Sequence, residues 1–202
     1  TGGIGADIVA YTRAGEPDSL APRFKLRAKV LKENLPRLFD LLAEIMTESD
    51  FSGAKRIREI VDEEKTGMEL SLQRAANQVV AARIAGYLMP SGCYTEVGGL
   101  PFHDFLRAFK DDFAALHEEM QAAFARIIPQ IFNRNDLMVS ITAPAADYET
   151  VATGLADFQS KLSGAEFPVA SYTWEIAARN EGLMTQSRVQ YVAKGANFIK
   201  LG

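Results

Sequence analysis

Cysteine and histidine are scarce in this sequence of 202 residues. The chain has one cysteine, Cys93, and two histidines, His103 and His117. One cysteine excludes an internal disulfide and a CxxC metal site, and it predicts a reducing compartment, a bacterial cytoplasm or an organelle matrix. Two isolated histidines cannot form a typical catalytic zinc site without ligands from elsewhere. We therefore expect no metal site and no catalytic residue within this chain.

Long apolar runs and an excess of positive charge are also missing. The most apolar stretch, 79–89, is interrupted by Arg83 and is shorter than the ~20 residues that a membrane span needs. The formal net charge is -4, whereas phosphate binding usually needs a basic face. We therefore expect neither a membrane nor a nucleic acid as a partner. The chain starts at Thr1 without an initiator methionine or signal peptide, which predicts a processed or truncated polypeptide.

The hydrophobic patterns that are present predict an α+β fold. Residues 5–12 and 23–31 alternate between apolar and polar side chains, as strands do, and the connection 14–22 predicts an antiparallel hairpin. Helical spacing follows after Asn34, which is a candidate N-cap. The expected helices span 36–46, 52–89 (one helix, or two broken near Gly67), 102–109, 111–132 and 146–162. The fourth of these is expected to stop around Pro129 and 133–136. A Gly-rich loop is expected at 91–101, and further strands are expected at 137–142 and 187–195.

The segment FAALHEEMQAAF around His117 contains part of a zinc-binding helix motif. The motif HExxH needs a second histidine four residues after the first, and this position is Gln121. The inverted motif HxxEH is also incomplete, because only its first residue is present at His103. We therefore expect an ordinary amphipathic helix, on which His117 has a structural or solvent-exposed role.

A basic row is the one feature that points to binding. Lys25, Arg27 and Lys29 alternate with apolar residues and therefore lie on one face of the strand 23–31. Three cations on one sheet face could attract anionic or backbone-carbonyl groups of a bound chain. The alternative is the ordinary solvent-facing side of an antiparallel sheet. The three residues are our candidate substrate contacts.

Several blocks of sequence occur in a particular order along nearly the whole chain. They are TGGIGADIVAY (1–11), FKLRAKVL (24–31), LKENLPRLFDLLAEIMTESDFSGAKRIREIVDEEKTGMELSL (31–72), GGLPFHDFLRAF (98–109), IFNRNDLMVSITA (131–143) and NEGLMTQSRVQYVAKGANF (180–198). In this order they resemble presequence-protease-type zinc peptidases of the pitrilysin and insulin-degrading-enzyme superfamily. The chain departs from that pattern at Asn77-Gln78, where the family often has Gly-His, and this difference concerns local packing.

The resemblance implies a fold and a position in a larger protein. Such peptidases have four related α/β domains in two halves that close around a chamber. Each domain is a two-layer sandwich with an antiparallel sheet covered on one face by helices, one of them long. Residues 1–162 would form most of the third domain, and residues 163–202 the linker and first strand region of the fourth.

The resemblance also implies where the chemistry lies. Zinc and its general base belong to the first domain, so zinc is a cofactor of the full-length parent and not of this chain. The chain would be a non-catalytic part of the C-terminal half, forming chamber wall and scaffold. Its partners would be peptide substrates and the N-terminal catalytic half of the same polypeptide. We expect the isolated chain to cleave nothing.

Two alternatives remain open at this stage. The same superfamily fold serves as a non-catalytic scaffold that binds partner subunits in some assemblies. A stand-alone helical interaction module is the other alternative, and it would require the resemblance to be accidental. Whether the isolated chain forms a homodimer by pairing exposed strands also stays open.

Overall fold

The computed structural model describes residues 2–13, 15–168, 172–178, 180–184 and 189–198. Its strands and helices are β1 (Gly3–Arg13), β2 (Glu16–Lys29), α1 (Leu35–Thr47), α2 (Ala54–Arg74), α3 (Ala76–Leu88), α4 (Pro90–Val97), α5 (Leu100–Asp111), α6 (Phe113–Ile131) and α7 (Tyr148–Ser160). The chain forms two compact units. Unit 1 comprises Thr1–Asp7, Phe24–Gly53 and His117–Ala170, and unit 2 comprises Ile8–Arg23, Ala54–Leu116 and Ser171–Gly202. The predicted α+β class with an antiparallel sheet is confirmed.

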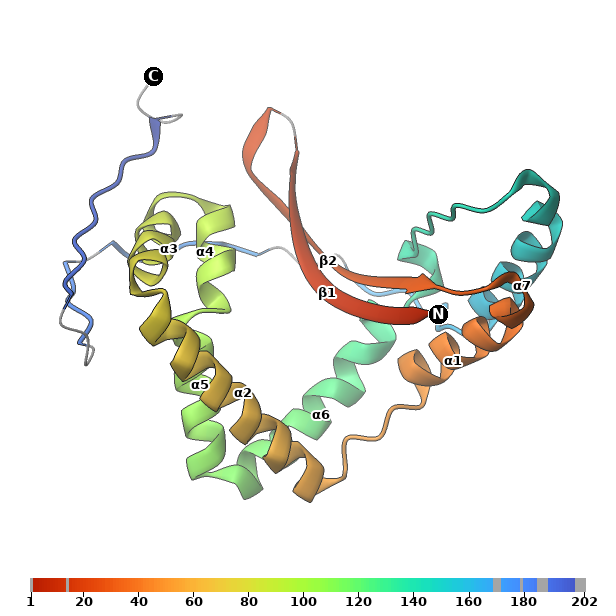
Figure 1. Ribbon diagram of the computed structural model, residues 1–202, viewed down its shortest axis with the longest axis horizontal. Coiled ribbons are helices and arrows are strands. Elements are labelled where there is room, and N and C mark those ends of the chain that lie inside the picture. The colour runs from red at the N-terminus through yellow and green to blue at the C-terminus, as the bar shows by residue number, and fades with distance from the viewer. Residues whose placement is uncertain (1, 14, 169–171, 179, 185–188, 199–202) are drawn as a thin grey trace. The chain divides into compact units, whose positions relative to one another are not determined.

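Strands β1 and β2 form a hairpin that Figure 1 shows as one long ribbon. Gly15 lies in the turn with φ of 80°, a left-handed conformation that glycine adopts without strain. The predicted connection 14–22 is therefore wrong, because β2 already begins at Glu16. Pro22 can lie inside β2 because a two-stranded ribbon leaves one side of each strand without a ladder partner, where a missing N–H is tolerated.

The core of unit 1 lies between α1, α7 and one face of β2. Asn34 occupies the predicted N-cap position of α1, although its side chain makes no capping hydrogen bond. The rings of Phe39 and Phe158 are 5.8 Å apart, and Leu26 of β2 packs against the same cluster. A Cβ at Gly154 would lie 2.8 Å from Phe39 Cε2, so glycine allows α7 to approach α1 closely. The buried members of the cluster are Phe39, Ala43, Met46, Phe158 and Leu162.

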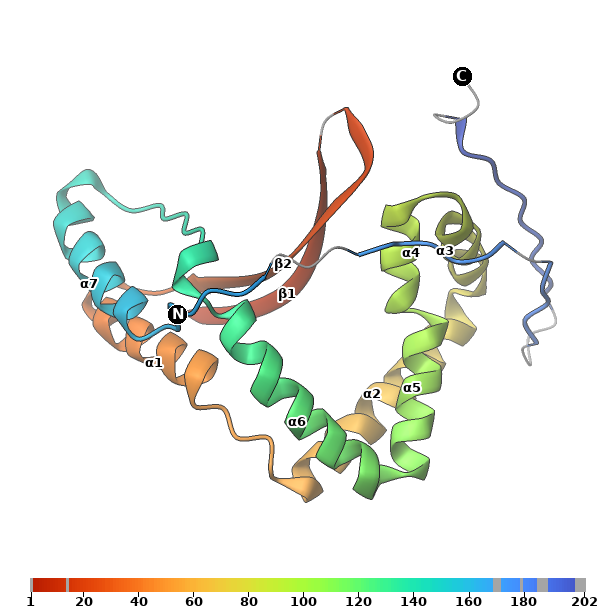
Figure 2. The same ribbon diagram turned by 180° about the vertical axis from the view of Figure 1, so that it is seen from behind.

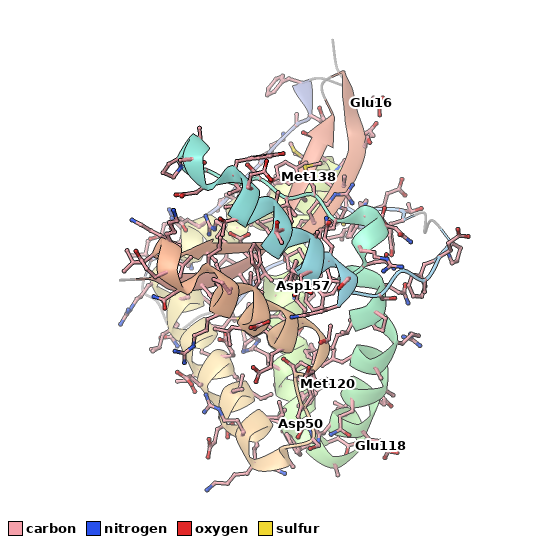
Figure 3. The ribbon with its side chains drawn as sticks, turned by 90° about the vertical axis from the view of Figure 1, so that its right-hand side faces the viewer. Glu16, Asp50, Glu118, Met120, Met138 and Asp157 are labelled. Atoms are coloured by element: carbon pink, nitrogen blue, oxygen red, sulfur yellow. The ribbon has the colours of Figure 1, made fainter. Side chains whose placement is uncertain are left out.

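Neither of the two later strands forms in the described residues. The segment 137–142 alternates in polarity but lies outside any strand, and Met138, labelled in Figure 3, is 90% exposed. The prediction is wrong because a strand requires a neighbouring backbone, and the sheet of the described residues contains β1 and β2 alone. In the second predicted strand, residues 187 and 188 lie outside the described residues, and 189–195 form no strand.

Unit 2 packs α2 against α5 and α3 against α4. The predicted long helix is two helices, and the break lies at Ala75, with φ of -120° and ψ of 35°, and not near Gly67. Phe109 is the most buried apolar side chain of this unit, and its ring packs 5.5 Å from that of Phe113. The guanidinium of Arg58 lies 4.0 Å above the Phe113 ring, in cation–π geometry.

The predicted Gly-rich loop at 91–101 is also wrong. Pro90 occupies the first turn of α4, where its missing N–H costs nothing. A Cβ at Gly92 would lie 2.2 Å from the carbonyl oxygen of Ala85, so this glycine allows α4 to pack against α3. Pro129 lies inside α6, which ends at Ile131, just before the predicted stop at 133–136. Among the described residues, no helix has the length and apolar character to cross a membrane.

Candidate functional site

The basic row lies on β2 as the alternation predicts. Lys25, Arg27 and Lys29 are exposed, whereas Leu26 packs into the core of unit 1. Arg27 Nη2 donates a hydrogen bond of 2.8 Å to Asp7 Oδ2 of β1, which neutralises one of the three cations within the hairpin. The row therefore presents charge to solvent, and its contact with a substrate stays a prediction.

His117 is a buried side chain that binds the linker between α1 and α2. Its Nε2 lies 2.9 Å from the carbonyl oxygen of Phe51, and Gln121 Nε2 donates to the same oxygen at 3.1 Å. Figure 3 labels Asp50 in this linker and Glu118 near the start of α6. Gln121 thus occupies the position of the missing zinc histidine and fastens the linker together with His117.

His103 lies on α5 beside acidic groups. Its Nε2 is 3.5 Å from Glu69 Oε1, and its Nδ1 is 3.7 Å from Asp104 Oδ1. Glu69 is also bound by Lys65, whose hydrogen bond lowers the pKa of the Glu69 carboxyl. No group of three or more His, Cys, Asp or Glu side chains in the described ranges is placed to hold a metal ion.

Cys93 is buried in α4. Burial raises the pKa of the Cys93 thiol, and the negative charges of Glu175 and Glu96 raise it further. A thiol held in its protonated form is a poor nucleophile. The environment of Cys93 therefore favours a structural role.

A partly buried ion cluster lies in unit 2. Arg83 of α3 donates from Nη1 to Glu96 Oε1 at 3.0 Å and from Nε to Glu181 Oε1 at 2.5 Å. Tyr87 donates its hydroxyl proton to the same Glu181 oxygen. The Glu181 hydrogen bond raises the pKa of Arg83, and Glu96 and Tyr87 raise it further, while burial opposes them.

This cluster was missed at the sequence level, although a signal was present. Arg83 interrupts the most apolar stretch of the chain, and a cation at such a position needs a buried partner. The partners are 13 and 98 residues away in sequence, so no local pattern identifies them. The cluster joins α3 and α4 to Glu181 through charge-assisted hydrogen bonds.

A cleft of about 680 Å³ lies close to this cluster in unit 2. Its lining comes from Asp18, from residues 86–90 where α3 ends and α4 begins, and from the segment 172–177. Farther along the chain, Asn197 Nδ2 donates to the Leu88 carbonyl at 2.9 Å, so the segment 189–198 also contacts α3. The lining offers aromatic rings, carboxylates and backbone groups, which suit binding more than bond cleavage.

Known proteins with similar sequences identify the family of this chain. The family described as associated with peptidase M16, subfamily C, matches residues 1–109. The chain is 26% identical over 200 residues to Protein HypA of Clostridium perfringens (strain 13 / Type A), covering 98% of this chain and 20% of that protein. It is 26% identical over 206 residues to Presequence protease 1, chloroplastic/mitochondrial, of Arabidopsis thaliana, covering 100% of this chain and 19% of that protein.

The chain therefore spans about a fifth of the length of these curated relatives. The resemblance to presequence-protease-type peptidases of the pitrilysin superfamily is confirmed, because the matched relatives include a presequence protease. Since the family match covers more than half of the sequence and both relatives align along nearly all of it, the chain belongs to the family associated with peptidase M16, subfamily C.

Proposed function

We propose that this chain is a non-catalytic part of a zinc-dependent peptidase that degrades unstructured peptides inside a closed chamber. The observation that carries the proposal is the alignment of the whole of this chain with part of a presequence protease, together with the match to the peptidase-associated family. The alignment covers 19% of that relative, which leaves room for the catalytic residues in the N-terminal half of a longer polypeptide. This catalytic half and the peptide substrates are the proposed partners.

The proposed role of this chain is to form chamber wall and scaffold. Residues 1–162 would be most of the third α/β domain, and residues 163–202 the linker and first strand region of the fourth. In unit 1 the core lies on the face of β2 that carries Leu26, and the opposite face carries Lys25, Arg27 and Lys29. A sheet with one covered face and one charged face suits a wall that contacts peptide chains.

The described residues do not fit a zinc centre of their own. The ring of His103 lies beside Glu69 and Asp104, and His117 Nε2 is directed at a backbone carbonyl. The resemblance to presequence-protease-type peptidases supports a zinc site in the catalytic half of the parent protein. When bound there, zinc supplies a water molecule of lowered pKa. This chain contributes shape and charge to the chamber, and no step of the reaction is assigned to it.

A reducing compartment suits a chain with one cysteine, and Cys93 is buried as a thiol. The plant relative carries the words chloroplastic/mitochondrial in its name, which supports an organelle matrix as one setting. A bacterial cytoplasm is the other proposed setting. Neither setting requires a disulfide for stability.

The proposed function is tested on the intact polypeptide that contains this chain. We expect about one zinc per chain by elemental analysis, and chelator-sensitive cleavage of unstructured peptides. The 202-residue chain is the control and should cleave nothing. Chelator-sensitive cleavage by the chain alone would contradict the non-catalytic assignment. An intact polypeptide with no zinc and no cleavage would instead favour the scaffold homologue that binds partner subunits.

The basic row is tested by reversing its three charges in the intact polypeptide, with Lys25→Glu, Arg27→Glu and Lys29→Glu combined. Each exposed ion pair contributes at most about 1 kcal/mol, so we expect kcat/KM for acidic peptides to fall by roughly tenfold. The value for basic peptides should rise. The matched control reverses three exposed cations of α2, which are Lys55, Arg56 and Arg74. Unchanged peptide selectivity in the first variant would remove the row from the site.

A further inference from the structure

The cleft in unit 2 has no role in the function proposed above. Figure 2 shows the segment 172–178 passing along α3 and α4, and this segment forms one side of the cleft. The approach is close, because a Cβ at Gly86 would lie 3.4 Å from Ile176 Cδ1. A volume of about 680 Å³ lies in the range of sites that hold a small molecule.

Aromatic rings form the first binding element of the cleft. Trp174 is half-buried, and Tyr94 of α4 packs against it edge-on, with ring centroids 5.3 Å apart and planes at 75°. Tyr172 lies 5.9 Å from Trp174 at a smaller interplanar angle of 37°, and it is 67% exposed. An exposed ring beside a cleft offers its negative face to a cation.

A carboxylate forms the second binding element. Glu175 lines the cleft and is exposed. It lies near α4, since its charge contributes to the raised pKa of the Cys93 thiol. Arg83 in the same unit already forms ion pairs with Glu96 and Glu181. Glu175 therefore places a negative charge beside the aromatic rings of the cleft.

We propose that this cleft binds the side chain of an arginine in a peptide. A guanidinium is planar, stacks on aromatic rings and pairs with a carboxylate, so it matches Tyr172, Trp174 and Glu175 together. An anion would meet negative charge on this lining, and an apolar group would gain nothing from the carboxylates. The inference rests on the proposed function for one claim, that the bound peptide is a substrate.

The test uses the fluorescence of Trp174, which is the only tryptophan of the chain. The 202-residue chain is titrated with acetyl-Gly-Arg-Gly-amide and with the same peptide carrying citrulline, which has the shape of arginine without its charge. We expect a saturable change with the arginine peptide, which weakens as salt is added. The citrulline peptide should bind about two- to fivefold more weakly.

Two variants separate the binding elements. Glu175→Gln and Tyr172→Leu should each raise the Kd of the arginine peptide by about two- to fivefold. Glu149→Gln, an exposed change on α7 in unit 1, is the matched control and should leave Kd unchanged. Circular dichroism verifies that each variant keeps its helices.

The outcomes are distinguishable from those of the proposed function, because no cleavage is measured here. A chain that retains its helices but shows no saturable change, or that binds both peptides equally, overturns the arginine site and leaves the peptidase proposal intact. A Glu175→Gln variant that binds as tightly as the parent chain also overturns it. Conversely, an intact polypeptide without peptidase activity would not affect the measured Kd.

Discussion

Arg83 offers the most direct test of how unit 2 is held together. Its side chain is 11% exposed and lies between Glu96, which is 2% exposed, and Glu181, which is 21% exposed. Arg83→Met keeps an unbranched side chain but removes the guanidinium, so the 2% exposed carboxylate of Glu96 loses its ion pair with Arg83. Removing one partner of a buried ion pair costs about 3–5 kcal/mol. Because domains are stable by only about 5–15 kcal/mol, we expect a large fall in the free energy of unfolding.

The assay is urea unfolding of the chain, followed by circular dichroism and by Trp174 fluorescence, which reports on unit 2. Arg56→Met is the matched control, since Arg56 is exposed and its pair with Glu59 on the same helix contributes about 0.2–0.5 kcal/mol. Combining Arg83→Met with Glu96→Met also removes the buried carboxylate of Glu96 and should recover about 2 kcal/mol or more. The reasoning is refuted if Arg83→Met costs no more than the control, or if the double variant is as unstable as the single one.

The remaining predictions concern local packing and acid stability. Gly92→Ala should destabilise the chain by about 1–3 kcal/mol, because its Cβ would meet the Ala85 carbonyl oxygen at 2.2 Å. Gly67 lies in α2, and no atom lies within 4 Å of the position of its Cβ, so Gly67→Ala should instead stabilise the chain by about 0.5–1 kcal/mol. Equal effects of the two substitutions on Tm would contradict both estimates. The Ser52 backbone N–H lowers the pKa of the exposed Asp50 carboxyl from 3.8. This stabilisation is present above pH 3.8 and is lost as pH falls through the lower folded-state pKa. The free energy of unfolding of Asp50→Asn should therefore decrease less at acid pH than that of the parent chain. Parallel profiles of the two free energies against pH would contradict this.

Local patterns were sufficient for most helices and for the hairpin. The 3.6-residue spacing after Asn34 correctly predicted α1, and the pattern at 146–162 correctly predicted α7 within two residues at each end. The alternation at 23–31 correctly assigned Lys25, Arg27 and Lys29 to the exposed side. These features succeed because the direction of a side chain depends on backbone period alone.

Two of the errors depended on a packing partner outside the local segment. Gly92 and its neighbours were predicted as a loop, but glycine is needed there because α3 and α4 pack within contact distance. The segment 137–142 has the polarity pattern of a strand but has no neighbouring backbone with which to pair. A glycine in a loop and a glycine at a close helix contact look the same in the sequence, as do an alternating segment inside a strand and one outside it. Only the packing partner distinguishes them.

The candidate sites divide in the same way. The row on β2 follows from alternation, whereas the cleft and the ion cluster bring α3 together with residues beyond 170. The absence of a second histidine predicted an ordinary helix with a structural or solvent-exposed role for His117, but its contact with the Phe51 carbonyl could not be predicted. A hydrogen bond across 66 residues leaves no mark on either local segment.

The sequence by itself determined the α+β class, the amphipathic helices, the exposed basic row and the family, because backbone periodicity and ordered blocks of residues are properties of the linear chain. Only the tertiary structure decided that Arg83 is partly buried and paired with Glu96 and Glu181, and that residues 86–90 and 172–177 line one cleft. The physical reason is that burial of charge and the closing of a cleft depend on which distant segments exclude water together, and elements far apart in sequence make those contacts.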